Sequence, residues 1–299
     1  MMVRMDLRQA SSAENPGGVQ PVTEDVVDAH VHLWDLGAQE HAWIPSGSPI
    51  RRSFGPADLR SALAGTPVRR VVLVQVVNDA AETRTFLAHA REDRLVAGVV
   101  GWVDLARPDV GEALDELADG GALVGIRHQA LAEADPSAWL RSPQVQRGLT
   151  ALEARGLPFE LMIRPEHFPA AVEAVRAHPS MRFVLDHLGK APIAAGRPEP
   201  WGTGLRTLAA EPNVWCKLSG VHTIAPPDWT YADLAPFVET ALDAFTPGRV
   251  IYGSDWPVSL QAATYAEVLQ AAGQACAPLS AAERAGVLGR NARLVYGLS

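Results

Sequence analysis

The stretch DVVDAHVHLWD, residues 25–35, decides the fold of this chain. It begins as an apolar run, typical of a buried strand, and ends in two histidines. An open doubly wound sheet would normally carry a glycine-rich phosphate-binding turn after its first strand. A closed barrel instead carries reactive side chains at the carboxyl ends of its strands. The stretch therefore favours a barrel over an open sheet.

Outward from this stretch, short runs of β-branched and apolar residues alternate with longer segments rich in Ala, Leu, Glu and Arg. This alternation is typical of βαβ units and a parallel sheet. Eight apolar strands buried on both faces fit an α/β fold, a single-domain (β/α)8 TIM barrel. The predicted strands are residues 25–31, 70–77, 95–103, 122–128, 157–163, 181–185, 213–218 and 249–252, and the predicted helices are 81–92, 109–118, 144–155, 165–177, 205–210 and 231–244.

Composition limits the functional classes open to the chain. Hydrophobic residues make up 47% of its 299 residues and charged residues 20%, which suits a globular domain with a sizeable core. The net charge of −8 does not suit a nucleic-acid partner. No apolar run is long enough to span a membrane. We therefore expect a small-molecule substrate and either a monomer or a homodimer.

The boundaries of the domain and the cellular location of the protein are predicted from its N-terminal sequence and its cysteines. Residues 1–24 contain no apolar signal segment and are predicted to be a flexible leader, so the folded domain is predicted to cover residues 25–299. Two cysteines without a CxxC spacing cannot form a disulfide framework. These features predict a cytoplasmic protein with reduced thiols.

Histidines and an aspartate follow three of the predicted strands. His30 and His32 alternate along the first strand, so both side chains point to the same face, into the barrel mouth. Two imidazoles on one face are a natural start to a metal site. His187 follows the sixth strand in DHLGK, and Asp255 follows the eighth in GSDWP. Because the first and last strands adjoin in a closed barrel, Asp255 is expected beside the histidines.

The segments HVHLWD, VLDHLGKAPI, NVWCKLSGV and VIYGSDWPVS resemble the amidohydrolase superfamily, one segment per strand end. More narrowly, they are similar to its lactonase-type branch, which includes fuconolactonases, rhamnonolactonases and pyrone-dicarboxylate lactonases. The resemblance covers residues 25–299. It implies a barrel that hydrolyses a cyclic ester, with catalytic roles for His30, His32, His187 and Asp255.

The resemblance leaves the need for a metal open. Many superfamily members carry a metal-binding histidine on the fifth strand, where this chain has Glu160 in PFELMIRP. A single divalent ion, zinc first among the candidates, would be held by His30, His32 and Asp255, with Glu160 as a possible fourth ligand. Metal-free catalysis by the same side chains is the alternative. In either case Asp255 is the expected base that activates water.

Five further residues are predicted to contact substrate. Burying an unpaired ammonium is costly, so Lys217 is expected to reach the polar mouth of the barrel. Arg127 is preferred to its neighbour His128, because strand alternation gives the two residues opposite faces. The remaining histidines are expected at the surface, with His222 the exception. The complete set of predicted substrate contacts is Lys217, Arg127, Gln75, Trp34 and Trp256.

Lactone hydrolysis is the leading functional hypothesis, and two others remain. One is a metal-dependent decarboxylase or amide hydrolase of the same superfamily. That branch usually has the fifth-strand histidine that this chain lacks. The other is a non-catalytic small-molecule-binding barrel, which would have no need to keep the three histidines and Asp255 together.

Overall fold

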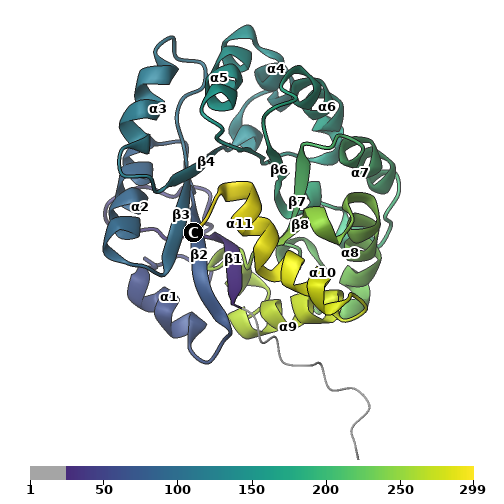
Figure 1. The fold of residues 1–299 in the computed structure, drawn as a ribbon. Helices are drawn as coiled ribbons and strands as arrows, with labels where there is room; N and C mark the ends of the chain where they lie inside the picture. Colours follow the sequence, from purple (N-terminus) through teal and green to yellow (C-terminus); the bar gives the residue numbers. More distant parts are fainter. Residues whose placement is uncertain (1–24) are drawn as a thin grey trace, which may run out of the picture.

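The computed structural model describes residues 25–299, and the predicted leader, residues 1–24, lies outside the described residues. Eight parallel strands form one sheet in the order β1 to β8, ringed by helices (Figure 1). The predicted (β/α)8 barrel is therefore confirmed. Its strands are β1 (Val26–Val31), β2 (Val68–Val74), β3 (Val96–Gly101), β4 (Leu123–His128), β5 (Phe159–Leu161), β6 (Phe183–Leu185), β7 (Val214–Leu218) and β8 (Val250–Tyr252).

The helices surround the sheet as the alternating pattern predicts, but more of them are present than the pattern identified. The six predicted helices appear as α2 (Ala80–Glu92), α3 (Val110–Ala118), α5 (Pro143–Ala154), α6 (Phe168–Ala177), α7 (Trp201–Ala209) and α8 (Tyr231–Phe245). The additional ones are α1 (Pro56–Leu63), α4 (Pro136–Arg141), α9 (Tyr265–Cys276), α10 (Ala281–Ala285) and α11 (Asn291–Tyr296).

Helix α9 shows that a local signal for a missed helix was present. The Thr264 backbone N–H donates to the Glu267 carboxylate at 2.7 Å, and the Glu267 N–H donates to the Thr264 hydroxyl at 3.3 Å. This reciprocal pair is a capping box, readable in the sequence TYAE. The alternation of strands and intervening helices does not predict α9, because this helix follows the last strand.

The barrel closes between β8 and β1 through loop backbone at the carboxyl ends of both strands. The His32 N–H donates to the Trp256 carbonyl at 2.7 Å, and the Asp255 N–H donates to the His30 carbonyl at 2.9 Å. Val31 and Trp256 form an isolated parallel bridge at the same place. These bonds fix Asp255 beside the first strand, as the closed topology requires.

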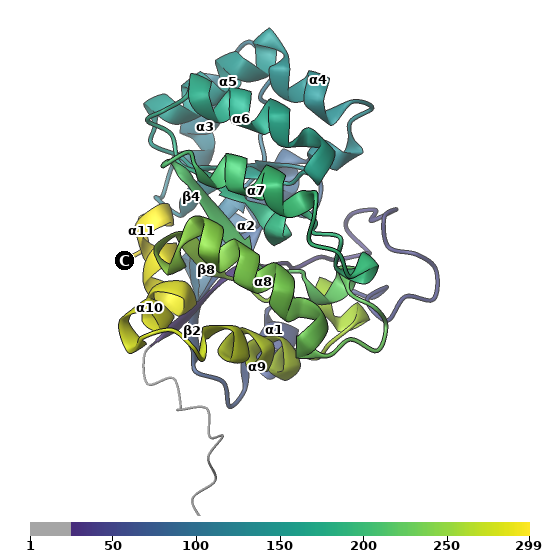
Figure 2. The same cartoon turned by 90° about the vertical axis from the view of Figure 1, so that its right-hand side faces the viewer.

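The two ends of the barrel differ. Helix α11 lies across the end where β1 begins, and the segment between β1 and α1 projects from the opposite end (Figure 2). Reactive side chains at the carboxyl ends of the strands lie at this second end. Within residues 25–299, no helix combines the length and the apolar character that crossing a membrane requires.

Candidate active site

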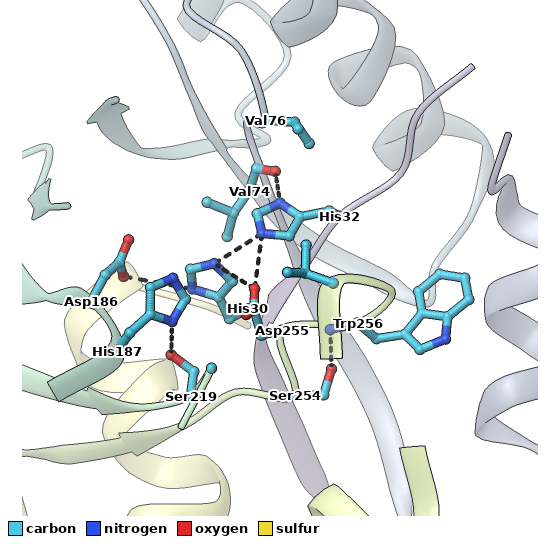
Figure 3. A network of polar contacts seen from close by, with 12 residues as sticks. His30, His32, Val74, Val76, Asp186, His187, Ser219, Ser254, Asp255 and Trp256 are labelled. Carbon is cyan, nitrogen blue, oxygen red and sulfur yellow. Dashed lines mark hydrogen bonds and ion pairs between the residues drawn. The ribbon is translucent and has the colours of Figure 1, made fainter. Parts of the chain in front are cut away.

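His30 and His32 lie at the centre of the site, as the alternation along β1 predicts. Their Nε2 atoms are 3.1 Å apart, and both side chains are buried (Figure 3). The Nδ1 atom of His32 lies 2.7 Å from the Val74 carbonyl, which can only accept a hydrogen bond. Nδ1 therefore carries the proton when His32 is neutral. This leaves the lone pair of His32 on Nε2, facing His30.

Asp255 completes this group. Its Oδ1 atom lies 3.3 Å from His32 Nε2 and 3.7 Å from His30 Nε2. Burial alone would raise the pKa of Asp255, but its electrostatic interactions with the imidazoles of His187, His32 and His30 outweigh burial and hold the pKa well below its usual value. Asp255 is therefore an ionised carboxylate in the centre of the barrel mouth.

His187 approaches the same group from the end of β6. Its ring centroid lies 4.6 Å from that of His30, and its Nδ1 atom lies 2.9 Å from the Ser219 hydroxyl. Burial, and then the charge of Lys190, lower the pKa of His187 to about 3, so the imidazole is neutral at physiological pH. The remaining nitrogen, Nε2, has no hydrogen-bond partner among residues 25–299.

Beneath His30 lies a cluster of buried charges. The Lys217 ammonium is 3.1 Å from His30 Nδ1, 2.6 Å from the Glu160 carboxylate and 3.3 Å from that of Asp186. The Arg127 guanidinium is 3.1 Å from His30 Nε2 and 3.0 Å from Asp186. All five side chains are buried, so the cluster lies inside the barrel rather than at its surface.

This cluster shows what surrounds Lys217. The ammonium lies below His30, the Lys217 side chain is fully buried, and its charge is balanced by Glu160 and Asp186. The cost of burying it is met by carboxylates that the sequence spacing did not reveal. Contact of Lys217 with substrate stays a prediction. Arg127 points inward as alternation predicts, while His128 points outward and stacks on Trp139.

Glu160 lies apart from Asp255. Its Oε1 atom accepts hydrogen bonds from Lys217 and from the Tyr296 hydroxyl at 2.5 Å, the latter reaching in from α11. Burial, and then the charge of Asp186, raise the pKa of Glu160 to about 7. Possible ligand atoms gather within 4.8 Å of one another in two groups, His30 with His187 and Asp255, and His30 with Glu160 and Asp186. In the group that contains Asp255 the third member is His187, whereas Glu160 belongs to the other group, and its role as a ligand stays a prediction.

The residues around Asp255 fit a divalent cation by their donor chemistry. Burial, and then the charge of Lys217, lower the pKa of His30 well below its usual value; burial also lowers that of His32. Neutral imidazoles with an ionised carboxylate are ligands that zinc accepts. Two buried cations, Arg127 and Lys217, adjoin His30, and the carboxylates of Asp186 and Glu160 are paired with them. The ligand set around Asp255 therefore fits a divalent cation.

The three other predicted substrate contacts are buried around this centre. Gln75 on the β2 side donates from its amide to the Arg127 carbonyl at 3.2 Å, an internal hydrogen bond. The Trp34 indole donates to the Arg52 carbonyl at 2.7 Å, and Trp256 packs edge-on against Phe54. Trp34 and Trp256 follow the strand ends that bear His32 and Asp255, Gln75 follows β2, and contact with substrate stays a prediction for all three.

Two residues important to the site were not identified from the sequence. Asp186 pairs with both buried cations, and Asp28 accepts hydrogen bonds from the N–H of His30 at 3.1 Å and of Ser254 at 2.8 Å. Both are adjacent to predicted site histidines, in the motifs DAHVH and DHLGK. The sequence did contain a signal for both residues, because each is a carboxylate at the end of an apolar strand. A buried carboxylate requires a hydrogen-bond donor or a cation as its partner.

Comparison with known proteins gives consistent matches. A sequence model of the amidohydrolase family matches residues 27–298. The chain is 40% identical to an L-fucono-1,5-lactonase of Burkholderia ambifaria over 78% of this chain and 80% of the relative. It is 35% identical to an L-fucono-1,5-lactonase of Burkholderia multivorans over 91% of this chain and 96% of the relative. A crystal structure of a Burkholderia multivorans amidohydrolase with bound zinc has a TM-score of 0.86 at 34% identity, covering 92% of this chain and all of that one.

Proposed function

The chain belongs to the amidohydrolase family, and on that premise we propose that it hydrolyses the ester bond of a lactone, with a sugar 1,5-lactone as the first candidate. The observation that carries this proposal is the convergence of one ionised carboxylate, Asp255, with three neutral imidazoles at the barrel mouth. The relatives that share the family over most of their length are named as L-fucono-1,5-lactonases.

Asp255 supplies the base. Its carboxylate is ionised at neutral pH and can accept a proton from a water molecule as the water oxygen attacks the lactone carbonyl carbon. The ester bond between that carbon and the ring oxygen then breaks. The ring oxygen takes up the proton that Asp255 accepted and leaves as a hydroxyl. The carbonyl carbon becomes a carboxylic acid, which releases the second proton of the water to solvent and leaves an open-chain hydroxy carboxylate.

His187 is the candidate for holding the carbonyl oxygen. Its Nδ1 atom is engaged by Ser219, and its Nε2 atom is left without a partner among the described residues. A neutral imidazole that carries its proton on Nε2 can donate a hydrogen bond to the oxygen as negative charge develops on it. Ser219 then fixes the tautomer by donating its hydroxyl proton to Nδ1.

A divalent ion is part of the proposal, with zinc the first candidate. His30, His32 and Asp255 would hold it, with His187 close by, and it would polarise the carbonyl group and lower the pKa of water. Metal analysis of the purified protein, with activity measured before and after chelation, tests this part separately. If the protein stays active after chelation has removed all bound metal, the chemistry is carried out by the side chains alone.

The experiment that tests the reaction is proton release from lactones in a weakly buffered indicator solution. The panel contains L-fucono-1,5-lactone, other aldonic lactones and 2-pyrone-4,6-dicarboxylate, each measured against its spontaneous hydrolysis. We expect enzyme-dependent acid release with the sugar 1,5-lactone. Silence across the panel, with the protein folded and zinc supplied, would contradict the proposal and favour the decarboxylase or amide-hydrolase alternatives.

A further inference from the structure

Tyr296 belongs to the C-terminal helix, yet it contacts the charged cluster beneath His30. It is the last residue of α11, which lies across the end of the barrel opposite to the mouth (Figure 2). Its side chain is buried, and its hydroxyl donates a hydrogen bond to Oε1 of Glu160 at 2.5 Å. The last helix thus reaches the charges inside the barrel from the end that faces away from the substrate.

The carboxylate of Glu160 is held at only one of its two oxygens. Oε1 accepts the Tyr296 hydroxyl and, at 2.6 Å, the Lys217 ammonium, whereas Oε2 has no hydrogen-bond partner among residues 25–299. The terminal torsion of a glutamate side chain has broad energy minima, so the carboxylate can rotate unless its oxygens are engaged. Loss of the hydroxyl would leave Lys217 as the one described donor that holds this carboxylate.

The Lys217 ammonium in turn fixes one side of the His30 ring. A lysine has a flexible four-carbon stem, so the atoms around its ammonium decide where the charge lies. Here they are oxygens of Glu160 at 2.6 Å and Asp186 at 3.3 Å, and Nδ1 of His30 at 3.1 Å. Nε2 of the same ring faces Asp255 at 3.7 Å. Because the ring torsion of histidine is also broad, a displaced ammonium would turn His30 relative to Asp255.

We propose that Tyr296 is a positioning residue for lactone hydrolysis, which acts on His30 through Glu160 and Lys217. The inference rests on the proposed function, because it takes His30 to belong to the reacting group. Every contact along this path joins two buried side chains. Misplacing a group at the reacting centre slows the reaction, while the contacts that bind the rest of the lactone stay the same.

Tyr296→Phe tests the inference, because it removes the hydroxyl and keeps the ring beside the Lys217 ammonium, 5.6 Å from the ring centroid. We expect kcat for L-fucono-1,5-lactone to fall about tenfold, with KM within about twofold of the wild type. Val295→Ala is the matched control, because it removes buried apolar contacts of the same helix and no hydrogen bond. It should lower the melting temperature and leave kcat close to that of the wild type.

Two results would overturn the inference. One is an unchanged kcat in Tyr296→Phe. The other is a similar loss of kcat in Val295→Ala, which would trace the effect to the packing of α11 rather than to the hydroxyl.

Glu160→Met tests the path, because methionine has a similar length and no oxygen. If Tyr296 acts through the carboxylate, adding Tyr296→Phe to this variant should change kcat by less than about twofold. The same tenfold loss in both backgrounds would show that Tyr296 does not act through Glu160, and the inference would be wrong.

The position of His30 can also be followed without any turnover, by NMR of the protein with isotope-labelled histidine. The His30 resonances are identified by their absence in His30→Gln. The ring nitrogen shifts of His30 should change in Tyr296→Phe and stay as in the wild type in Val295→Ala. Unchanged shifts in Tyr296→Phe would overturn the inference, also where Glu160→Met does not fold. Failure of the proposed function would be seen separately, as no lactone turnover by the wild type.

Discussion

Two residues with proposed catalytic roles are held in backbone conformations that L-amino acids rarely adopt. Asp255 has φ = 59° and His187 has φ = 52°, both in the left-handed region. Such positions cost of order 1–3 kcal/mol each and persist only where surrounding structure enforces them. Here the backbone bond from Asp255 to His30 and the turn that follows β6 enforce them. Their coincidence with the two residues assigned to base and oxyanion contact supports a functional reason for the strain.

Asp255→Asn tests the role of the base. The amide keeps the size of the side chain but cannot accept a proton from water, so kcat should fall by at least about a hundredfold. The melting temperature should change by only a few degrees, because the backbone bonds of residue 255 remain. Activity close to that of the wild type would remove Asp255 from the mechanism.

Glu82 should make the stability of the folded protein depend on pH. Its carboxylate accepts hydrogen bonds from the N–H groups of Val76 and Val77 at 2.7 and 3.3 Å, at the start of α2. Burial nevertheless raises its pKa from 4.5 to about 7. The folded protein therefore binds a proton more tightly than the unfolded chain does. The stability due to this proton is complete below pH 4.5 and is lost as pH rises to about 7.

Glu82→Gln should remove this loss. The amide oxygen can accept the same two N–H bonds without carrying charge, so the melting temperature should fall less between pH 5 and pH 8 than in the wild type. The difference corresponds to a free energy of unfolding on the order of 3 kcal/mol. Glu116→Gln, on the exposed face of α3, is the control. The same pH dependence in both variants and the wild type would contradict the assignment.

At the scale of elements, the turn after β7 must leave room for the side chains of His187 and Asp255. Gly220 has φ = 61°, and a Cβ atom there would lie 2.5 Å from His187 Nδ1 and 2.9 Å from an Asp255 oxygen. No side chain fits without displacing one of them. Gly156, after α5, has a similar φ of 65° with nothing within 4 Å of the same position. Alanine substitutions at Gly220 and Gly156 therefore distinguish the effect of backbone strain, present at both, from the effect of crowding the site, present only at Gly220.

Gly220→Ala and Gly156→Ala should therefore differ in activity more than in stability. Both changes place alanine in the left-handed region at a cost of roughly 1–2 kcal/mol. Only Gly220→Ala should also displace His187 and Asp255, and its kcat should be at least about a hundredfold lower. Lactone turnover and melting temperature, measured on both variants, check this. Equal lactone turnover by the two variants would show that the turn after β7 accommodates alanine without displacing His187 or Asp255.

For the whole molecule, Asp28 holds the junction between the first and last strands. Besides the N–H groups of His30 and Ser254, its carboxylate accepts the hydroxyl of Tyr265 from α9 at 2.8 Å. The residue is fully buried. One side chain thus links β1, the loop after β8 and the following helix, which is where the barrel closes.

Asp28→Ala should loosen this junction. The buried N–H of Ser254 would lose its acceptor, and the free energy of unfolding should fall by on the order of 3 kcal/mol. Tyr265→Phe removes only one of the three bonds and should cost about 1 kcal/mol. Denaturant unfolding curves of both variants measure the difference. If Asp28→Ala unfolds at the denaturant concentration of the wild type, closure does not depend on this carboxylate.

Much of the architecture was predictable because a buried strand appears in the sequence as a short, continuous apolar run. Eight apolar runs, and the identity of the residues at their carboxyl ends, require no knowledge of distant partners. The convergence of His30, His32, His187 and Asp255 then follows from the closed topology alone, since parallel strands bring their carboxyl ends to one mouth. Strand alternation also placed Arg127 inward and His128 outward.

The sequence by itself thus determined the barrel, the strand ends that bear the chemistry and the faces of their residues. Only the tertiary structure decided the partners of the buried charges. Lys217 contacts His30, 187 positions away, and Glu160, 57 positions away. It likewise buried His41 without a hydrogen-bond partner among residues 25–299. The physical reason is that the energy of a buried polar group depends on the atoms around it, and chain spacing does not specify those atoms.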